Sequence, residues 1–194
     1  MIKEQAEGGA SHLCRAEASQ LVVVDVQPRL AAAMPEADGA RTIRNLGVLL
    51  AAARALEVPV LATEQYPKGL GATEPEVAGH FPEATRILEK TAFSCCGADG
   101  FTACLDAADR PQVVLAGMEA HVCVLQTAFE LGGRGFQVFV VEDAVCSRDP
   151  RNHRNALERL RQAGVVVTST ESVVFEWLRD ARHPQFKALS ALLK

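Results

Sequence analysis

Short, continuous apolar runs constrain the fold of this chain more than any other feature of its sequence. Residues 20–26 read Gln-Leu-Val-Val-Val-Asp-Val, and residues 112–117 read Gln-Val-Val-Leu-Ala-Gly. A strand that is apolar on both faces is typical of a parallel sheet covered by helices on both sides. These runs therefore favour an α/β fold with the strands at its centre.

Strands and helices are expected to alternate along the chain. Apolar runs predict strands over residues 20–26, 58–63, 87–90, 112–117, 136–141 and 165–168. Apolar stripes and end signals predict helices over residues 39–57 (capped by Asp38), 99–109, from His121 or Val122 to Gly132, 150–163, 170–180 and 183–193. Residues 64–83, with three prolines and three glycines, are expected to form a long loop. This alternation predicts a parallel sheet with helices on both faces.

The size and composition of the chain fit one globular domain. Its 194 residues, 48% hydrophobic and 23% charged, suffice for one well-buried domain and are few for two. Residues 1–18 are polar, with two adjacent glycines, and are expected to form a flexible leader. We therefore expect a single domain over residues 19–194.

Charge and cysteine usage narrow the partners and the compartment. A net charge of −4 argues against a nucleic-acid-binding surface, and no apolar run approaches the length of a membrane span. The N-terminus lacks the apolar core of a signal peptide. The six cysteines include no Cys-x-x-Cys pair. We expect a cytoplasmic protein with free thiols and no nucleic-acid or membrane partner.

Three reactive side chains lie where the predicted strands end. Asp25 stands near the end of the first strand, Lys90 ends the third, and Cys123 follows the fourth at the first turn of a predicted helix. Ligands bind at the carboxyl ends of parallel strands, and under the strand order 3-2-1-4-5-6 the first and fourth strands flank the switch point. We therefore expect Asp25 and Cys123 to meet, with the carboxylate able to take the proton of the thiol.

Each of these residues also has a structural interpretation. Asp25 could bond loop amides, Lys90 could be solvated, and Cys123 could fill space between helix and sheet. A charge inside a valine-rich run is costly unless it is used or paired, and a helix N-terminus favours a thiolate. The combination of an acid, a base and a thiol at one sheet edge favours a nucleophilic site.

Three motifs in order resemble those of a known family. Residues 21–27 read Leu-Val-Val-Val-Asp-Val-Gln, residues 89–94 read Glu-Lys-Thr-Ala-Phe-Ser, and residues 117–128 read Gly-Met-Glu-Ala-His-Val-Cys-Val-Leu-Gln-Thr-Ala. From about residue 13 to 190 the chain resembles the isochorismatase-like cysteine hydrolases, which include nicotinamidases and N-carbamoyl amide hydrolases. The stretch over residues 63–71 is most similar to the isochorismatase-domain-containing subgroup.

The resemblance implies a three-layer α/β/α Rossmann-like fold, with a six-stranded parallel sheet in the order 3-2-1-4-5-6, and a triad of Asp25, Lys90 and Cys123. It also implies a cis peptide at Met118–Glu119 and an oxyanion held by backbone N–H groups from Glu119 to Cys123. Asp25 would accept the Cys123 proton, Lys90 would hold the charged partners, and water would cleave a thioester intermediate. Family members commonly assemble as homo-oligomers, so a dimer or a larger assembly is expected.

The resemblance breaks down at the metal site of the nicotinamidases. Their Asp-x-His pair is absent, because residues 63–67 read Thr-Glu-Gln-Tyr-Pro and the next histidine is His80. We therefore expect no catalytic metal and no cofactor, with His80 as a surface loop residue. The tentative substrate contacts, each with a structural alternative left open, are Gln27, Glu64, Gln65, Phe93 and His121. Cys95 and Cys96 are further candidates for the pocket.

The expected function is metal-independent cleavage of an amide-type C–N bond in a small molecule. Isochorismate hydrolysis splits a vinyl ether, which offers no acyl carbon to a thiolate, so the retained Cys123 favours an amide-type substrate. Vinyl-ether hydrolysis and a non-catalytic role remain alternatives. A redox protein pairing Cys123 with Cys95 or Cys96 is disfavoured by the missing Cys-x-x-Cys. Asp143, Ser147 and Arg148 are expected to form a structural polar network after the fifth strand.

Overall fold

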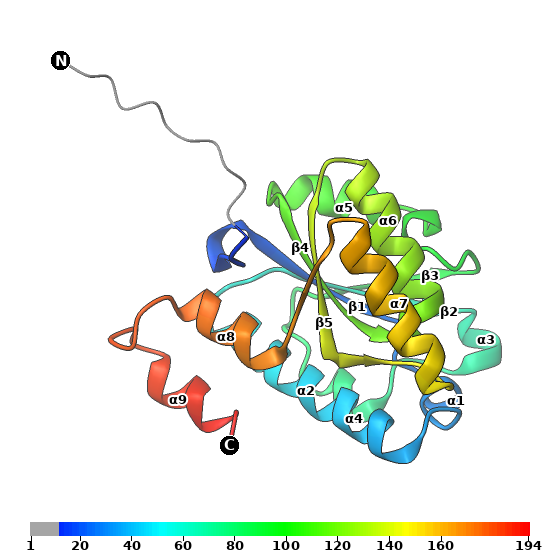
Figure 1. Cartoon of the computed structure of the whole chain (residues 1–194), viewed down its shortest axis with the longest axis horizontal. Helices are drawn as coiled ribbons and strands as arrows, with labels where there is room; N and C mark the ends of the chain where they lie inside the picture. Colours follow the sequence, from blue (N-terminus) through cyan, green and yellow to red (C-terminus); the bar gives the residue numbers. More distant parts are fainter. Residues whose placement is uncertain (1–11) are drawn as a thin grey trace.

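A six-stranded sheet in the order β3-β2-β1-β4-β5-β6 forms the centre of the molecule in the computed structural model, which describes residues 12–194 (Figure 1). Every neighbouring pair of strands is parallel. The strands are β1 (Ser19–Val24), β2 (Val60–Gln65), β3 (Arg86–Lys90), β4 (Gln112–Met118), β5 (Gln137–Cys146) and β6 (Val166–Thr168). The predicted fold class and strand order are confirmed.

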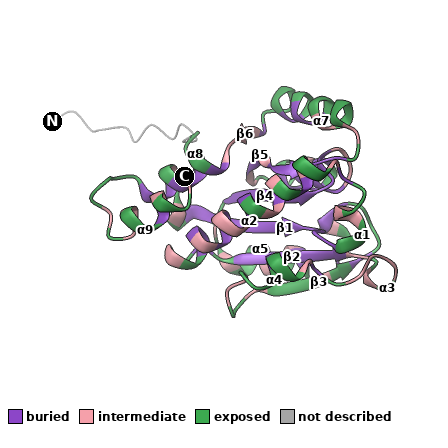
Figure 2. Ribbon diagram, turned by 90° about the horizontal axis from the view of Figure 1, so that it is seen from below, coloured by how far each residue is buried: buried purple, intermediate pink, exposed green. Residues whose placement is uncertain are grey.

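Helices cover both faces of the sheet and give it two apolar cores. The helices on one face are α2 (Glu36–Ala55), α8 (Thr170–Leu178) and α9 (Phe186–Ala191), and those on the other are α5 (Phe101–Ala108), α6 (Leu125–Gly133) and α7 (Pro150–Gln162). Side chains alternate along a strand, so Leu21 and Val23 of β1 join the first core and Val22 and Val24 the second. β1 and β4 are wholly buried, as Figure 2 shows, whereas the edge strand β3 is mostly exposed.

The region between β2 and β3 is more ordered than the sequence predicts. β2 continues through Gln65, and two single-turn helices follow, α3 (Pro67–Leu70) and α4 (Pro75–Ala78). A third short helix, α1 (Pro28–Ala31), follows β1. Each of the three begins with a proline, whose fixed φ suits the first helical position and whose missing N–H has no helical partner to lose. The expectation of one long loop over residues 64–83 was wrong.

Several element boundaries also differ from the prediction. Helix α2 begins at Glu36, and Asp38 lies in its first turn, where it accepts a hydrogen bond from Arg41 at 2.7 Å instead of capping the helix. Strand β5 runs on to Cys146, because its last residues pair with Gly117 and Met118 after a register shift. The segment before α6 is a π-helical turn, η3 (Ala120–Val124), and Cys123 therefore does not lie in the first turn of an α-helix.

Part of the predicted leader belongs to the domain. Residues 1–11 lie outside the described residues, but Cys14 is buried, its backbone N–H donates to the Glu176 carboxylate at 2.6 Å, and a 3-10 turn, η1 (Ala16–Ala18), precedes β1. Near the other end of the chain, Trp177 and its apolar neighbours in α8 pack on the molecule's own sheet. Within residues 12–194, no helix has the length and apolar content that crossing a bilayer requires.

Candidate active site

Asp25, Lys90 and Cys123 meet at the carboxyl edge of the sheet. Lys90 Nζ donates to Asp25 Oδ2 at 2.6 Å, and the Asp25 carboxylate lies close enough to the Cys123 thiol to raise its pKa. The three residues are 0%, 4% and 5% exposed, respectively. Asp25 follows β1 and Cys123 follows the adjacent strand β4, while Lys90 ends β3 and reaches Asp25 across the end of β2. The structure thus joins the three reactive residues that the sequence singled out.

The Asp25 carboxylate is held through both of its oxygens. Oδ2 accepts a hydrogen bond from Lys90 Nζ, and Oδ1 accepts one from Thr63 Oγ1 at 2.8 Å. The backbone of Asp25 adopts a left-handed conformation, with φ of +49° directly after β1. Aspartate tolerates this region better than most residues. The carboxylate is therefore fixed in position before any substrate binds.

Every hydrogen of the Lys90 ammonium is directed at the protein. Its Nζ lies 2.6 Å from Asp25 Oδ2, 2.6 Å from Gln65 Oε1, and 3.1 Å and 3.0 Å from the carbonyl oxygens of Ala92 and Phe93. A lysine has three N–H donors, so four acceptors account for all of them. Lys90 therefore acts on Asp25 and is not available to bind an oxyanion directly.

The surroundings of the Cys123 thiol favour its protonated form. Burial and the charge of Asp25 raise its pKa well above the ordinary value of a thiol, and Lys90 offsets only part of this rise. A helix N-terminus favours a thiolate, but desolvation and the neighbouring carboxylate act on Cys123 in the opposite direction. The geometry places this thiol beside a carboxylate that can accept its proton.

The peptide between Met118 and Glu119 is cis, which is the bond that the resemblance indicated. The Glu119 carboxylate accepts a hydrogen bond from the backbone N–H of Arg148 at 2.9 Å, and it also accepts hydrogen bonds from the Arg148 guanidinium. Burial alone would raise the pKa of Glu119, but the hydrogen bonds from Arg148 lower it below its usual range. The backbone N–H groups of Val122 and Val124 donate to the Glu119 carbonyl, at 3.1 Å and 3.2 Å. Of the predicted oxyanion donors, the N–H of Val122 is therefore already engaged.

Two of the tentative substrate contacts hold backbone instead. Gln27 is fully buried; its amide donates to the carbonyl of Gln65 at 3.1 Å and accepts the N–H of the same residue at 2.8 Å. Glu64 accepts the backbone N–H and the hydroxyl of Thr73, at 2.6 Å and 2.7 Å. Both side chains tie the segment after β2 to the sheet. These contacts support the structural alternative for Gln27 and Glu64.

Of the other tentative contacts, Gln65 and Phe93 bind Lys90, whereas His121 lies against Ser147. Gln65 binds Lys90, and the Phe93 side chain is 55% exposed while its carbonyl accepts from Lys90. His121 is half-buried, with its Nδ1 3.0 Å from Ser147 Oγ. Thr63, which the sequence analysis did not single out as a site residue, contacts Asp25. Its only signal in the sequence is a polar residue near the end of an apolar strand.

The three polar residues predicted to follow the fifth strand have structural partners, as expected, although Asp143 lies within β5 because the strand runs on to Cys146. Asp143 accepts the backbone N–H and the hydroxyl of Thr170, at 2.8 Å and 2.9 Å. Ser147 lies against His121, and Arg148 binds Glu119. These contacts join β5 to α8 and to the turn that carries Cys123.

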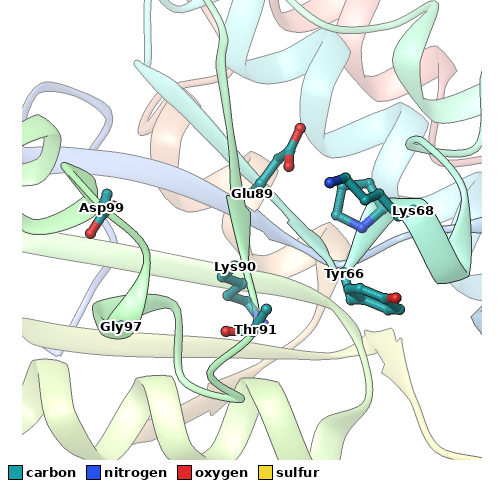
Figure 3. Close-up of a pocket in the computed structure, with 8 residues that line it drawn as sticks. Tyr66, Lys68, Glu89, Lys90, Thr91, Gly97 and Asp99 are labelled. Atoms are coloured by element: carbon teal, nitrogen blue, oxygen red, sulfur yellow. The ribbon is translucent and has the colours of Figure 1, made fainter.

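A pocket of about 430 Å³ opens beside Lys90, on the β3 side of the triad. Figure 3 shows Tyr66 and Lys68 on one side of β3, and Gly97 and Asp99 on the other. The wall carries both signs of charge, from Lys68 and from the carboxylates of Glu89 and Asp99. The pocket offers space for a small molecule next to the ion pair.

No cluster of three or more His, Cys, Asp or Glu side chains within residues 12–194 is arranged to hold a metal ion. His80 is exposed, and its carbonyl accepts a hydrogen bond from Arg54 at 2.8 Å. Gln65, in the stretch where nicotinamidases carry metal ligands, is bound to Lys90. A metal-free reaction stays a prediction.

Comparison with known proteins identifies the family. The model of the isochorismatase domain matches residues 19–172. The chain belongs to the isochorismatase family of hydrolases. The isochorismatase domain-containing protein 2 of Danio rerio is 42% identical over 151 residues, which cover 78% of this chain and 75% of that protein. The subgroup suggested by residues 63–71 is thus represented among the relatives.

Solved structures with the same fold include proteins of different description. The MAR1 ribonuclease of Caenorhabditis elegans is 37% identical with a TM-score of 0.88, covering 93% of this chain and 92% of that one. YcaC of Pseudomonas aeruginosa, solved with hexane-2,5-diol and covalent acrylamide, is 25% identical with a TM-score of 0.88, covering 95% and 92%. Its Escherichia coli counterpart, described as an octameric hydrolase of unknown specificity, is 24% identical with a TM-score of 0.84, covering 99% and 91%.

Proposed function

We propose that this isochorismatase-family hydrolase cleaves an amide-type C–N bond of a small molecule through a thioester on Cys123, without a metal or another cofactor. One observation carries the proposal: the buried Cys123 thiol lies beside the Asp25 carboxylate, which is itself paired with the buried Lys90. A thiol with a proton acceptor in contact is the arrangement that nucleophilic catalysis requires.

The first half of the reaction forms the thioester. As the substrate carbonyl approaches, Cys123 transfers its proton to Asp25 and its sulfur attacks the carbonyl carbon. The oxygen of the tetrahedral intermediate accepts a hydrogen bond from the backbone N–H of Cys123. The intermediate then collapses: the C–N bond breaks, the leaving nitrogen takes the proton from Asp25, and the acyl group stays on sulfur.

The second half releases the acid. A water molecule gives a proton to Asp25 and attacks the thioester carbon. When the C–S bond breaks, sulfur recovers the proton from Asp25, and the product leaves as a carboxylic acid. Asp25 thus accepts and donates one proton in each half. Lys90 holds the Asp25 side chain in place through both halves of the reaction.

The covalent acrylamide of Pseudomonas aeruginosa YcaC supports this proposal, because it shows a protein of the same fold bonded to an amide-bearing electrophile. The octameric state of Escherichia coli YcaC supports the related proposal that this chain forms a homo-oligomer. We expect the partners to be a small-molecule substrate and further copies of the chain.

A second candidate is ribonuclease activity, because one relative is described as a ribonuclease. Two observations rank it below the amidase. The net charge of −4 opposes a polyanionic substrate, and the lysine of the site has its hydrogens committed to protein acceptors. Vinyl-ether hydrolysis of isochorismate also ranks below amide hydrolysis, because that substrate offers Cys123 no acyl carbon to attack.

A substrate panel tests these functions against one another. The full chain is incubated with primary amides, N-carbamoyl compounds, isochorismate and single-stranded RNA, and ammonia, pyruvate and RNA fragments are measured. We expect ammonia from at least one amide-type compound, and none when Cys123 is replaced by alanine. The matched control is Cys104→Ala, which alters a half-buried cysteine on α5. Pyruvate or RNA fragments without ammonia, or ammonia release by the Cys123→Ala variant, would overturn the proposal.

A further inference from the structure

Strand β2 presents two polar side chains to the buried ion pair. Thr63 and Gln65 are two residues apart and so lie on the same face of the strand. In the parallel register, Gln65 is the direct neighbour of Lys90. Thr63 donates to Asp25, and Gln65 accepts from Lys90. Each member of the ion pair thus has a neutral partner on β2.

The Gln65 amide is held at both ends. Its Oε1 lies 2.6 Å from Lys90 Nζ, as close as the carboxylate of Asp25, and its Nε2 donates to the Thr91 carbonyl at 2.8 Å. A carbonyl accepts only from the NH₂ end of an amide, so the bond to Thr91 decides which end faces Lys90. The oxygen is therefore directed at the ammonium before substrate arrives.

We propose that Gln65 is a positioning residue, whose side-chain oxygen holds the Lys90 ammonium against Asp25. The other two acceptors of Lys90, the carbonyls of Ala92 and Phe93, are 3.0–3.1 Å away and belong to the loop after β3. Without Gln65, the ammonium shifts towards these carbonyls and its contact with Asp25 weakens. Being neutral, Gln65 orients Lys90 without competing with Asp25 for the charge.

This inference rests on the proposed function, because it gives Gln65 a part in the same proton transfer. The titratable groups that act on the Cys123 thiol are Asp25 at the end of β1, Lys90 on β3, and Cys95 on the turn η2 (Cys95–Gly97). A carboxylate at position 65 adds a second negative charge beside Asp25, and a like charge raises the pKa of a carboxyl group.

The test is the pH dependence of Cys123 alkylation by iodoacetamide, resolved by peptide mass mapping on the full chain. This probe needs no knowledge of the substrate. Gln65→Glu keeps an acceptor for Lys90, so we expect its maximal alkylation rate to stay near that of the wild type. The acid limb of its profile, where the alkylation rate falls as the pH is lowered, should move up by about one pH unit. Gln65→Leu removes the acceptor, and we expect its maximal rate to fall about tenfold. Gln162→Glu, on an exposed position of α7, is the matched control and should change neither quantity.

Two results would overturn the role of Gln65. In one, both Gln65 variants match the wild type; in the other, both lose the same fraction of the rate with no movement of the acid limb. Asp25→Asn separates this inference from the proposed function. If Asp25→Asn removes the acid limb of the alkylation profile but the Gln65 variants do not move it, the role of Gln65 is refuted and the proposed function stands. If Cys123 of Asp25→Asn is alkylated as in the wild type, Asp25 is not the proton acceptor and both proposals are refuted. Thermal unfolding of each variant verifies that it is folded.

Discussion

Two ion pairs lie at the carboxyl edge of the sheet, and they differ in the burial of the cation. In the pair of Asp25 and Lys90, both side chains are 0% exposed. In the pair of Glu119 and Arg148, the carboxylate side chain is 4% exposed, but the guanidinium is 61% exposed. Both carboxylates are buried, so the difference lies in where the positive charge meets water.

The contrast separates the pair that we propose to take part in the reaction from one with structural contacts. The charge of Lys90 is shielded from solvent and is held between Asp25, Gln65 and two carbonyls, so it acts at close range within the site. Arg148 binds Glu119 through two guanidinium nitrogens and its own N–H, which ties the segment after β5 to the residue that follows the cis peptide. Each pair can be broken by replacing its cationic residue.

Removing the buried cation should have the largest effect. Lys90→Met leaves the Asp25 carboxylate buried and uncompensated, and we expect the free energy of unfolding to fall by about 3–5 kcal/mol. Urea denaturation at neutral pH measures it, and amide turnover should be lost in parallel. An unchanged unfolding free energy would show that the pair of Asp25 and Lys90 does not stabilise the folded protein.

Removing the exposed cation should cost less. Arg148→Met also leaves a buried carboxylate, but Glu119 lies near the surface where water can replace part of the lost contact, so we expect a loss of about 1–2 kcal/mol in urea denaturation. Alkylation of Cys123 should stay close to the wild-type rate. A loss as large as that of Lys90→Met, together with loss of alkylation, would place Arg148 in the reactive site and erase the contrast.

The stabilisation from the exposed pair should depend on pH in a defined direction. Hydrogen bonds from Arg148 lower the folded pKa of Glu119 below its ordinary value of 4.5, so the stabilisation is fully present above that value. It is lost as the pH falls through the lowered pKa, where Glu119 becomes protonated in the folded state. The difference in unfolding free energy between the wild type and Arg148→Met should therefore shrink in acid. A difference that stays constant to strongly acidic pH would contradict this account.

An ion pair exposed at both ends sets the lower limit of the comparison. Arg161 on α7 and Glu142 on β5 are about half-exposed and meet at 2.6 Å. We expect Arg161→Met to change the unfolding free energy by about 0.5 kcal/mol or less, because exposed pairs are screened by water and salt. A loss comparable to that of Arg148→Met would mean that burial of the carboxylate is not what distinguishes the pairs.

The sequence predicted the sheet and the triad because both follow from local patterns. Apolar runs mark the strands, and Asp25, Lys90 and Cys123 each stand at or just after a strand end, where the topology must bring them together. Element boundaries were less predictable where tertiary contacts decide them. Strand β5, for example, continues past residue 141 because β4 offers Gly117 and Met118 as partners.

The partners of the triad could not be read from local patterns. Gln27 and Gln65 are 38 residues apart, yet the side-chain amide of Gln27 forms hydrogen bonds with both the backbone N–H and the carbonyl of Gln65. The amide of Gln65 is as suited to a substrate as to an ammonium, and only its distance to Lys90 decides between the two. The protonation state of Cys123 depends likewise on burial and on Asp25, which the backbone pattern around the cysteine does not encode.

Mass analysis of the protein quenched in acid during turnover tests the central claim most directly. With an amide-type substrate, we predict a mass increase equal to the acyl group, located on the peptide that contains Cys123, formed with the wild type and absent with Cys123→Ala. The Cys104→Ala control should carry the same adduct as the wild type. Turnover with no adduct on Cys123, or an adduct that persists in Cys123→Ala, would contradict the claim that this thiol is the nucleophile.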